Sequence, residues 1–294
     1  MTFPVSGVET PFWLPIAVAF AISTLTSMGG ISGAFLLLPF QVSVLGFTSP
    51  AVTPTNMIFN MVAIPGGVYR YAKEGRMVWA LIWAMSIGTI FGTLFGVFIR
   101  IKCLPDPKNF KAFVGIVLAY MAYLLIKEIF NRKPNKKMAG REFKVKTTEV
   151  SFGRISFEFN KVPYSVSTYW IFFLSVIVGI IGGVYGIGGG SLIAPALIVM
   201  FGLPVYTIAG ITLFNTFLTS FIGVLLYALI APRLAPSALA VTPDWILGLF
   251  FGIGGFFGIY LGSRLQRFVP AIYIKILLAV AISFISVKYI LGYF

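Results

Sequence analysis

The chain has 294 residues, of which 59% are hydrophobic and only 10% are charged, and its mean hydropathy is +0.97. A soluble domain carries roughly 25% charged residues, and several apolar runs here exceed the roughly 20 residues that span a bilayer core. The composition therefore predicts an all-α polytopic membrane protein. The apolar runs are continuous rather than alternating, which excludes a β-barrel.

The formal net charge is +14, and lysine and arginine gather between 132 and 161 and in short loops between the apolar runs. In a membrane protein this pattern predicts a positive-inside bias that meets anionic lipid, and no nucleic-acid partner. The chain has no histidine and a single cysteine, Cys103, so histidine or cysteine-cluster metal sites are excluded. We expect no metal, no cofactor and no enzymatic activity.

Taken in chain order, the apolar segments fall into two sets of four, at about 12–46, 50–72, 78–101 and 110–130, and at about 167–201, 205–230, 244–265 and 271–292. The first segment of each set contains glycines and is too long for one span. Each of these two segments is therefore either one long broken helix or two shorter segments joined at the break.

The two sets are copies of one unit. A shift of 156 residues aligns Gly33 with Gly189 and Pro39 with Pro195, and further on a shift of 166 aligns Trp79 with Trp245. We therefore expect a first transmembrane repeat at 1–130, a basic linker at 131–166 and a second repeat at 167–294. Four crossings per half would make the repeats parallel. Five crossings, or three plus a re-entrant hairpin, would make them inverted, which is the arrangement we favour.

The linker alternates polar and apolar residues around a Ser151–Gly153 turn, which predicts a β-hairpin rather than a disordered connector. Under inversion this linker faces the cytoplasm.

Glycine-rich stretches mark the start of each half, at Gly30 and Gly33 and again at 188–191 (Gly188, Gly189, Gly190 and Ser191). A helix that breaks here and restarts directs several N–H groups and a positive dipole end towards one point, which suits an anion. The alternative is tight helix packing. Packing is the prediction for "GTIFGTLFG" and "GGFFGIYLG", where glycine recurs at every fourth residue.

Uncharged polar residues follow in each half, namely Asn56 and Asn60 in the first and Thr212, Asn215 and Thr216 in the second. Such side chains inside a bilayer either join helices or line a substrate path. All eight carboxylates lie at span ends or in loops, so a carboxylate proton relay is not expected and anions are favoured over cations. Arg70 and Arg100, near span ends, are expected to snorkel to the interface.

Two stretches, "GVYGIGGGSLIAPALIVMFGLP" and "GGISGAFLLLPFQVSVLGF", together with the Asn- and Thr-bearing segments that follow them, resemble the TauE/SafE family of sulfite-exporter-like permeases. The resemblance covers nearly all of both halves and implies transport of small sulfur-containing anions such as sulfite, sulfonates or sulfoacetate across the inner membrane.

The sequence thus predicts a secondary transporter that binds an anion at the midplane between the two glycine-rich segments. The alternatives are an anion channel of the same fold and a permease for a small anion without sulfur. The oligomeric state is left open. The expected substrate-binding residues are Gly30, Gly33, Asn56, Asn60, Gly188, Gly189, Gly190, Ser191, Thr212, Asn215 and Thr216.

Overall fold

The structure is a computed structural model, and it describes residues 1–293 except 29–31, 76, 131–144, 152, 160, 161, 204, 237, 238, 266, 267 and 270. The first half contains helices α1 (Trp13–Met28), α2 (Ala34–Ser43), α3 (Val52–Ala63), α4 (Pro65–Lys73), α5 (Trp79–Lys102) and α6 (Pro107–Phe130). The second half contains α7 (Thr168–Tyr185), α8 (Gly190–Phe201), α9 (Val205–Leu229), α10 (Ala231–Leu234), α11 (Trp245–Leu265) and α12 (Ala271–Leu291).

Within the described residues, six helices are long and apolar enough to cross a membrane, which confirms the prediction of a helical multi-pass protein. They are Trp79–Lys102, Pro107–Lys127, Thr168–Tyr185, Thr207–Leu229, Trp245–Leu265 and Ile272–Leu291. Two shorter apolar helices, α1 and α2, come from the first long apolar segment. That segment is therefore two helices rather than one.

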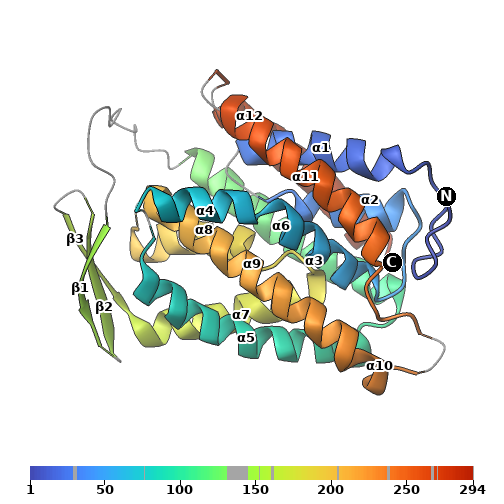
Figure 1. Cartoon of the computed structure of the whole chain (residues 1–294), viewed down its shortest axis with the longest axis horizontal. Coiled ribbons are helices and arrows are strands. Elements are labelled where there is room, and N and C mark those ends of the chain that lie inside the picture. The colour runs from blue at the N-terminus through green and yellow to red at the C-terminus, as the bar shows by residue number, and fades with distance from the viewer. Residues whose placement is uncertain are drawn as a thin grey trace.

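The two halves pack against each other through two glycine stripes, which are the stretches Gly88–Gly96 and Gly254–Gly262 with a glycine at every fourth residue. A Cβ atom on Gly88 of α5 would lie 2.7 Å from the backbone oxygen of Phe172 in α7. A Cβ atom on Gly258 of α11 would lie 2.5 Å from the backbone oxygen of Phe20 in α1. Only glycine allows backbones this close, so the packing prediction for both stripes is confirmed. Each half presses its stripe against the first helix of the other half (Figure 1).

The sequence that links the two halves forms a three-stranded antiparallel sheet. Its strands are β1 (Val145–Val150), β2 (Arg154–Phe159) and β3 (Val162–Ser167), in that order. The alternation in the sequence predicted the β1–β2 pair, and the structure adds β3. Phe157 is fully buried, and its ring stacks on Tyr164 of β3 with the centroids 5.6 Å apart. The sheet projects from one end of the molecule, and both chain termini lie at the other end (Figure 1).

One carboxylate, Asp244, is buried at the start of α11. Its Oδ1 accepts a hydrogen bond from the amide of Leu247 at 3.1 Å, and its Oδ2 accepts one from the hydroxyl of Ser6 at 2.8 Å. These bonds make Asp244 the N-cap of α11 and join the N-terminal segment to it. Its place at a helix end fits a structural role rather than a proton relay in mid-span.

Candidate functional site

The chain turns sharply where α7 gives way to α8, and we call residues Gly186–Gly190 the glycine turn. Gly186, Gly188 and Gly189 have φ angles of 83°, 71° and 76°, in the left-handed region that L side chains rarely adopt. A Cβ on Gly186 would lie 2.5 Å from the backbone oxygen of Thr53, and one on Gly188 would lie 2.5 Å from Cγ2 of Thr216. The backbone of the glycine turn therefore lies directly against α3 and α9.

Several amides of the glycine turn are buried without a hydrogen-bond acceptor. The amide of Gly186 donates to the oxygen of Gly182 at 2.7 Å, and that of Gly190 donates to Oγ1 of Thr216 at 3.0 Å. Within the described part of the chain, no acceptor is found for the amides at 187–189, although these residues are buried. A buried amide without a partner is costly, so this turn has donors to offer a ligand.

Asn56 of α3 joins the glycine turn to α2. Its Nδ2 donates to the oxygen of Ala34 in α2 at 3.0 Å and to the oxygen of Gly186 at 3.1 Å. Its Oδ1 accepts a hydrogen bond from Nε2 of Gln41 at 3.1 Å. Asn56 is fully buried, so all three bonds are shielded from water. Sequence reasoning did not select Gln41.

Asn60, one helical turn further along α3, joins the two halves. Its Nδ2 donates to the hydroxyl of Ser220 in α9 at 3.2 Å, and its Oδ1 accepts from the hydroxyl of Ser32 at 3.1 Å. Ser32 directly precedes Gly33, which is the N-cap residue of α2. Asn56 and Asn60 together hold the beginning of α2, the glycine turn and α9 around α3. We call Asn56 and Asn60, together with the side chains that they bond, the polar layer; the bonded side chains are those of Ser32, Gln41 and Ser220.

The polar residues of α9 divide between two neighbours. Thr216 accepts the hydrogen bond from Gly190 and donates to the oxygen of Thr212 at 2.8 Å, so both threonines face the glycine turn. Asn215 instead accepts a hydrogen bond at Oδ1 from the hydroxyl of Thr89 in α5 at 2.9 Å. Its buried Nδ2 has no partner in the described structure. Thr212 and Thr216 therefore lie against the glycine turn, whereas Asn215 faces α5.

The expected residues do not all gather at one point. Gly188, Gly189 and Gly190 form part of the glycine turn, with Thr212 and Thr216 against it, and Asn56 and Asn60 belong to the polar layer. Gly33 lies at the start of α2 beside Ser32, and Asn215 faces away towards α5. Gly30 and the side chain of Ser191 lie outside the described part of the chain.

Arg100 was expected to snorkel to the membrane surface, and that prediction is wrong. Its side chain is fully buried, and its guanidinium lies 3.7 Å over the ring of Phe110. Nε donates to the hydroxyl of Thr53 at 3.3 Å, Nη1 donates to the oxygen of Leu104, and Nη2 has no partner in the described structure. The chain folds back after α5 and covers the guanidinium, which the position of Arg100 near a span end could not reveal.

Thr53 connects this buried cation to the glycine turn. Its hydroxyl accepts from Arg100 and donates to the oxygen of Val184, in the last turn of α7, at 3.0 Å. No ion pair joins Arg100 to a carboxylate among the described residues. An unpaired buried charge is expensive. Among the described residues, Arg100 is thus a buried cation without a carboxylate partner, one hydrogen-bonded residue away from the end of α7.

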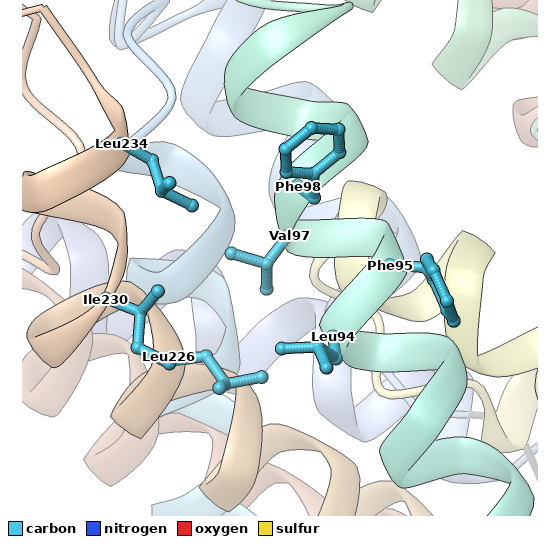
Figure 2. A pocket seen from close by; sticks show the side chains of 7 residues that line it. All are labelled: Leu94, Phe95, Val97, Phe98, Leu226, Ile230 and Leu234. Carbon is cyan, nitrogen blue, oxygen red and sulfur yellow. The ribbon is translucent and has the colours of Figure 1, made fainter.

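Among the described residues, no group of three or more histidine, cysteine or acidic side chains could hold a metal ion. A cavity of about 360 Å³ beside α5 and α9 is lined only by apolar side chains, as Figure 2 shows, and so offers no hydrogen bonds. The lining residues are Leu94, Phe95, Val97, Phe98, Leu226, Ile230 and Leu234.

Comparison with known proteins identifies a family and a curated relative. The family profile described as "Sulfite exporter TauE/SafE" matches residues 15–289. A curated relative, the "Probable membrane transporter protein YunE" of Bacillus subtilis (strain 168), is 30% identical over 94 residues. The matched region covers 32% of this chain and 31% of the relative, so the chain spans about a third of that protein's length. No solved structure matches the chain.

Proposed function

From its membership of the sulfite exporter TauE/SafE family, we propose that the chain is a secondary carrier of a small oxyanion. Members of this family are membrane transporters, so the chain is a membrane transporter and not an enzyme. The oxyanion binds near the midplane, between the glycine turn and the polar layer. Its chemical class is a sulfur-containing oxyanion or organosulfonate, such as sulfite, a sulfonate or sulfoacetate.

One observation carries the choice of an anion: the glycine turn has buried amides without acceptors, and Thr53 beside it binds a buried cation, Arg100, that has no carboxylate partner among the described residues. The amides at 187–189 lack acceptors, and Arg100 adjoins the same turn through Thr53. Backbone amides at the start of a helix such as α8 favour a negative ligand, and a desolvated arginine strengthens that preference. A cation would find no carboxylate here among the described side chains.

The repeats in this proposal are inverted, with α1–α2 and α7–α8 as re-entrant hairpins. Support comes from α5 and its counterpart α11. The end of α5 at Ile101 packs with Ala231 and Val241, which shortly precede the start of α11. The two equivalent helices therefore run in opposite directions. Inverted repeats of this kind place the substrate between the broken segments and alternate access by moving one half against the other.

Asn56 explains how such a movement could be coupled to binding. It bonds Ala34, at the start of α2, and Gly186, in the glycine turn, at the same time. Opening the path on either side separates one of these contacts from α3. An oxyanion that takes over the amides of the glycine turn would offset the lost bonds, because charge-assisted hydrogen bonds are about twice as strong as neutral ones.

The direction of transport follows from the membrane potential and the orientation. Lysines and arginines are concentrated in the linker sequence, and the sheet of the linker lies at one end of the molecule (Figure 1), so we place this end in the cytoplasm and the protein in the inner membrane. A potential that is negative inside drives an anion outwards with about 2.3 kcal/mol per charge per 100 mV. Export therefore needs no dedicated coupling ion.

The test is flux from proteoliposomes loaded with sulfite, sulfate, thiosulfate, sulfoacetate or taurine, with and without a proton gradient. Saturable efflux with counterflow for at least one sulfur oxyanion is expected, with taurine transported poorly because it carries no net charge. Unitary currents would instead identify a channel. Flux of none of these sulfur anions would overturn the sulfur assignment.

A further inference from the structure

A second cavity, of about 470 Å³, lies between the end of α2, the start of α6 and the end of α12. We call it the basic pocket. It is lined by Val42, Ser43, Pro107, Lys108, Lys111, Lys288, Tyr289 and Gly292. The C-terminal end of α12 places it at the end of the molecule opposite the sheet (Figure 1). It is separate from the glycine turn, and the transport mechanism above makes no use of it.

Three lysines and no acidic residue line the basic pocket. Lys108 and Lys111 are three residues apart on α6 and so share a helix face, and Lys288 reaches the pocket from α12. Asp106 lies close by in sequence, but its Oδ1 accepts the amides of Lys108 and Asn109 at 2.6 and 3.3 Å, and it is not among the lining residues. Three like charges around one cavity repel one another, and an anion bound between them lowers this repulsion.

The repeat fold itself does not demand these charges. The shift of 166 residues pairs Lys108 with Ile274 and Lys111 with Leu277 in the second half, and pairs Lys288 with Ala122 in the first. The equivalent position in the other repeat is therefore uncharged. The lysines also lie at the end of the molecule where the positive-inside bias predicts few basic residues. The three lysines therefore need an explanation that is specific to this pocket.

The lining of the basic pocket also provides hydroxyl groups held in place. The hydroxyls of Ser43 and Tyr289 are 2.6 Å apart, and the Tyr289 hydroxyl also donates to the oxygen of Pro39 at 3.3 Å. These bonds tie α12 to α2. Because α2 also carries Gln41, which donates to Asn56 in the polar layer, an occupant of the pocket would bear on a helix that contacts the transport site.

We propose that the basic pocket binds a tetrahedral oxyanion group, of the phosphate or sulfonate type, at the membrane surface. Its source is either the headgroup of an anionic phospholipid or a free oxyanion in solution. The chemistry is the same in both cases: the ammonium groups of the three lysines donate to the oxygens and neutralise their charge, and the Ser43–Tyr289 pair forms the polar wall beside them. The inference uses the orientation proposed above but not the proposed substrate or direction of transport, because its test measures binding and not flux.

The experiment compares the thermal stability of the purified full-length protein under two kinds of titration. In one, inorganic phosphate or sulfate is added to protein in neutral detergent, against potassium chloride at equal ionic strength. In the other, the protein is placed in phosphatidylcholine nanodiscs with or without phosphatidylglycerol. A rise in Tm with phosphatidylglycerol alone identifies a lipid site. A rise with phosphate or sulfate identifies a free-oxyanion site, and a rise with both identifies a pocket that accepts either source.

Variants tie the effect to the pocket. Removing its three lysines should abolish the ligand-dependent rise in Tm, whereas removing three lysines elsewhere should preserve it. The pocket variant is K108Q/K111Q/K288Q and the matched control is K73Q/K102Q/K127Q. Single variants cover the case in which the triple variant does not fold, and each should weaken the apparent affinity roughly fivefold.

Three results would overturn the proposal. The first is a wild-type protein whose Tm responds to no oxyanion or anionic lipid beyond the chloride control. The second is a rise that persists in K108Q/K111Q/K288Q. The third is equal loss in the pocket variant and the control variant, which would reduce the effect to net charge.

Discussion

At the scale of single residues, glycines at 188 and 202 make a matched pair. Both have positive φ angles, 71° and 63°, so alanine at either position carries a similar backbone strain of about 1 kcal/mol. A Cβ on Gly188 would lie 2.5 Å from Thr216 Cγ2 and 2.8 Å from Ser220 Oγ, whereas a Cβ on Gly202 meets nothing within 4 Å. The difference between the two variants therefore isolates the contact of the glycine turn with α9.

We predict that Gly188→Ala abolishes oxyanion flux while Gly202→Ala retains it, with both proteins recovered folded from detergent. The added methyl group displaces the turn from Thr216 and so misplaces its free amides. The measurements are proteoliposome flux and the Tm of each variant. Equal flux from the two variants would show that the geometry of this turn does not control transport.

Arg100 gives a second residue-scale prediction. Arg100→Gln removes the buried cation, and hydrogen bonds to a charged group are worth about 1.5–3 kcal/mol, so KM for the anion should rise roughly 10- to 100-fold. Stability should change little or improve, because the lost bonds to Thr53 and Leu104 are offset by relief from burying an unpaired charge. The concentration dependence of flux and the Tm measure both effects.

The control for Arg100→Gln is Arg233→Gln in α10, since Arg233 is exposed and loses the same charge. The control should transport like the wild type. A loss of stability in Arg100→Gln with unchanged KM would make Arg100 purely structural.

At the scale of helices, the glycine stripes decide how the halves meet. A Cβ on Gly92 would overlap the backbone oxygen of Val176 in α7, and neither helix can move away without separating the whole contact. Gly92→Ala should therefore lower the Tm and the yield, by about 1–3 kcal/mol of stability. Gly67→Ala is the control, because its Cβ would meet only the flexible end of Leu213 at 3.3 Å. Similar Tm values for the two variants would contradict the backbone contact.

Sequence patterns predicted the glycine stripes but not the partner of each stripe. Glycine at every fourth residue specifies a smooth helix face, whichever helix lies against it. The structure pairs α5 with α7 and α11 with α1, so each stripe faces the other half. The third strand, β3, was missed for a related reason: its sequence, VPYSVS, contains a proline and is recognisable as a strand only beside β2.

At the scale of the whole molecule, the orientation in the membrane can be read from two sites on either side of α6. Cys103 is exposed in the loop before α6, and Ser165 is exposed in the sheet that follows it. Because α6 is long enough to span the bilayer, the two positions lie on opposite faces. A membrane-impermeant thiol reagent applied to intact cells should label Cys103 in the wild type. It should label Ser165→Cys, in a Cys103→Ser background, only after permeabilisation.

Labelling of the sheet in intact cells, with Cys103 protected, would reverse the proposed orientation. Labelling of both positions from the same face would contradict the crossing of α6 and with it the inverted arrangement.

By itself, the sequence determined the class of the protein, because apolar runs of bilayer length and scarce charge leave a chain no other stable environment. It also predicted the duplication, since glycine, proline and tryptophan recur at constant offsets. Only the tertiary structure decided which polar groups meet. It buried Arg100 beneath Phe110, turned Asn215 towards α5 and brought Gln41 to Asn56. These contacts join residues distant in the chain, and the packing of whole helices sets them, which local spacing does not encode.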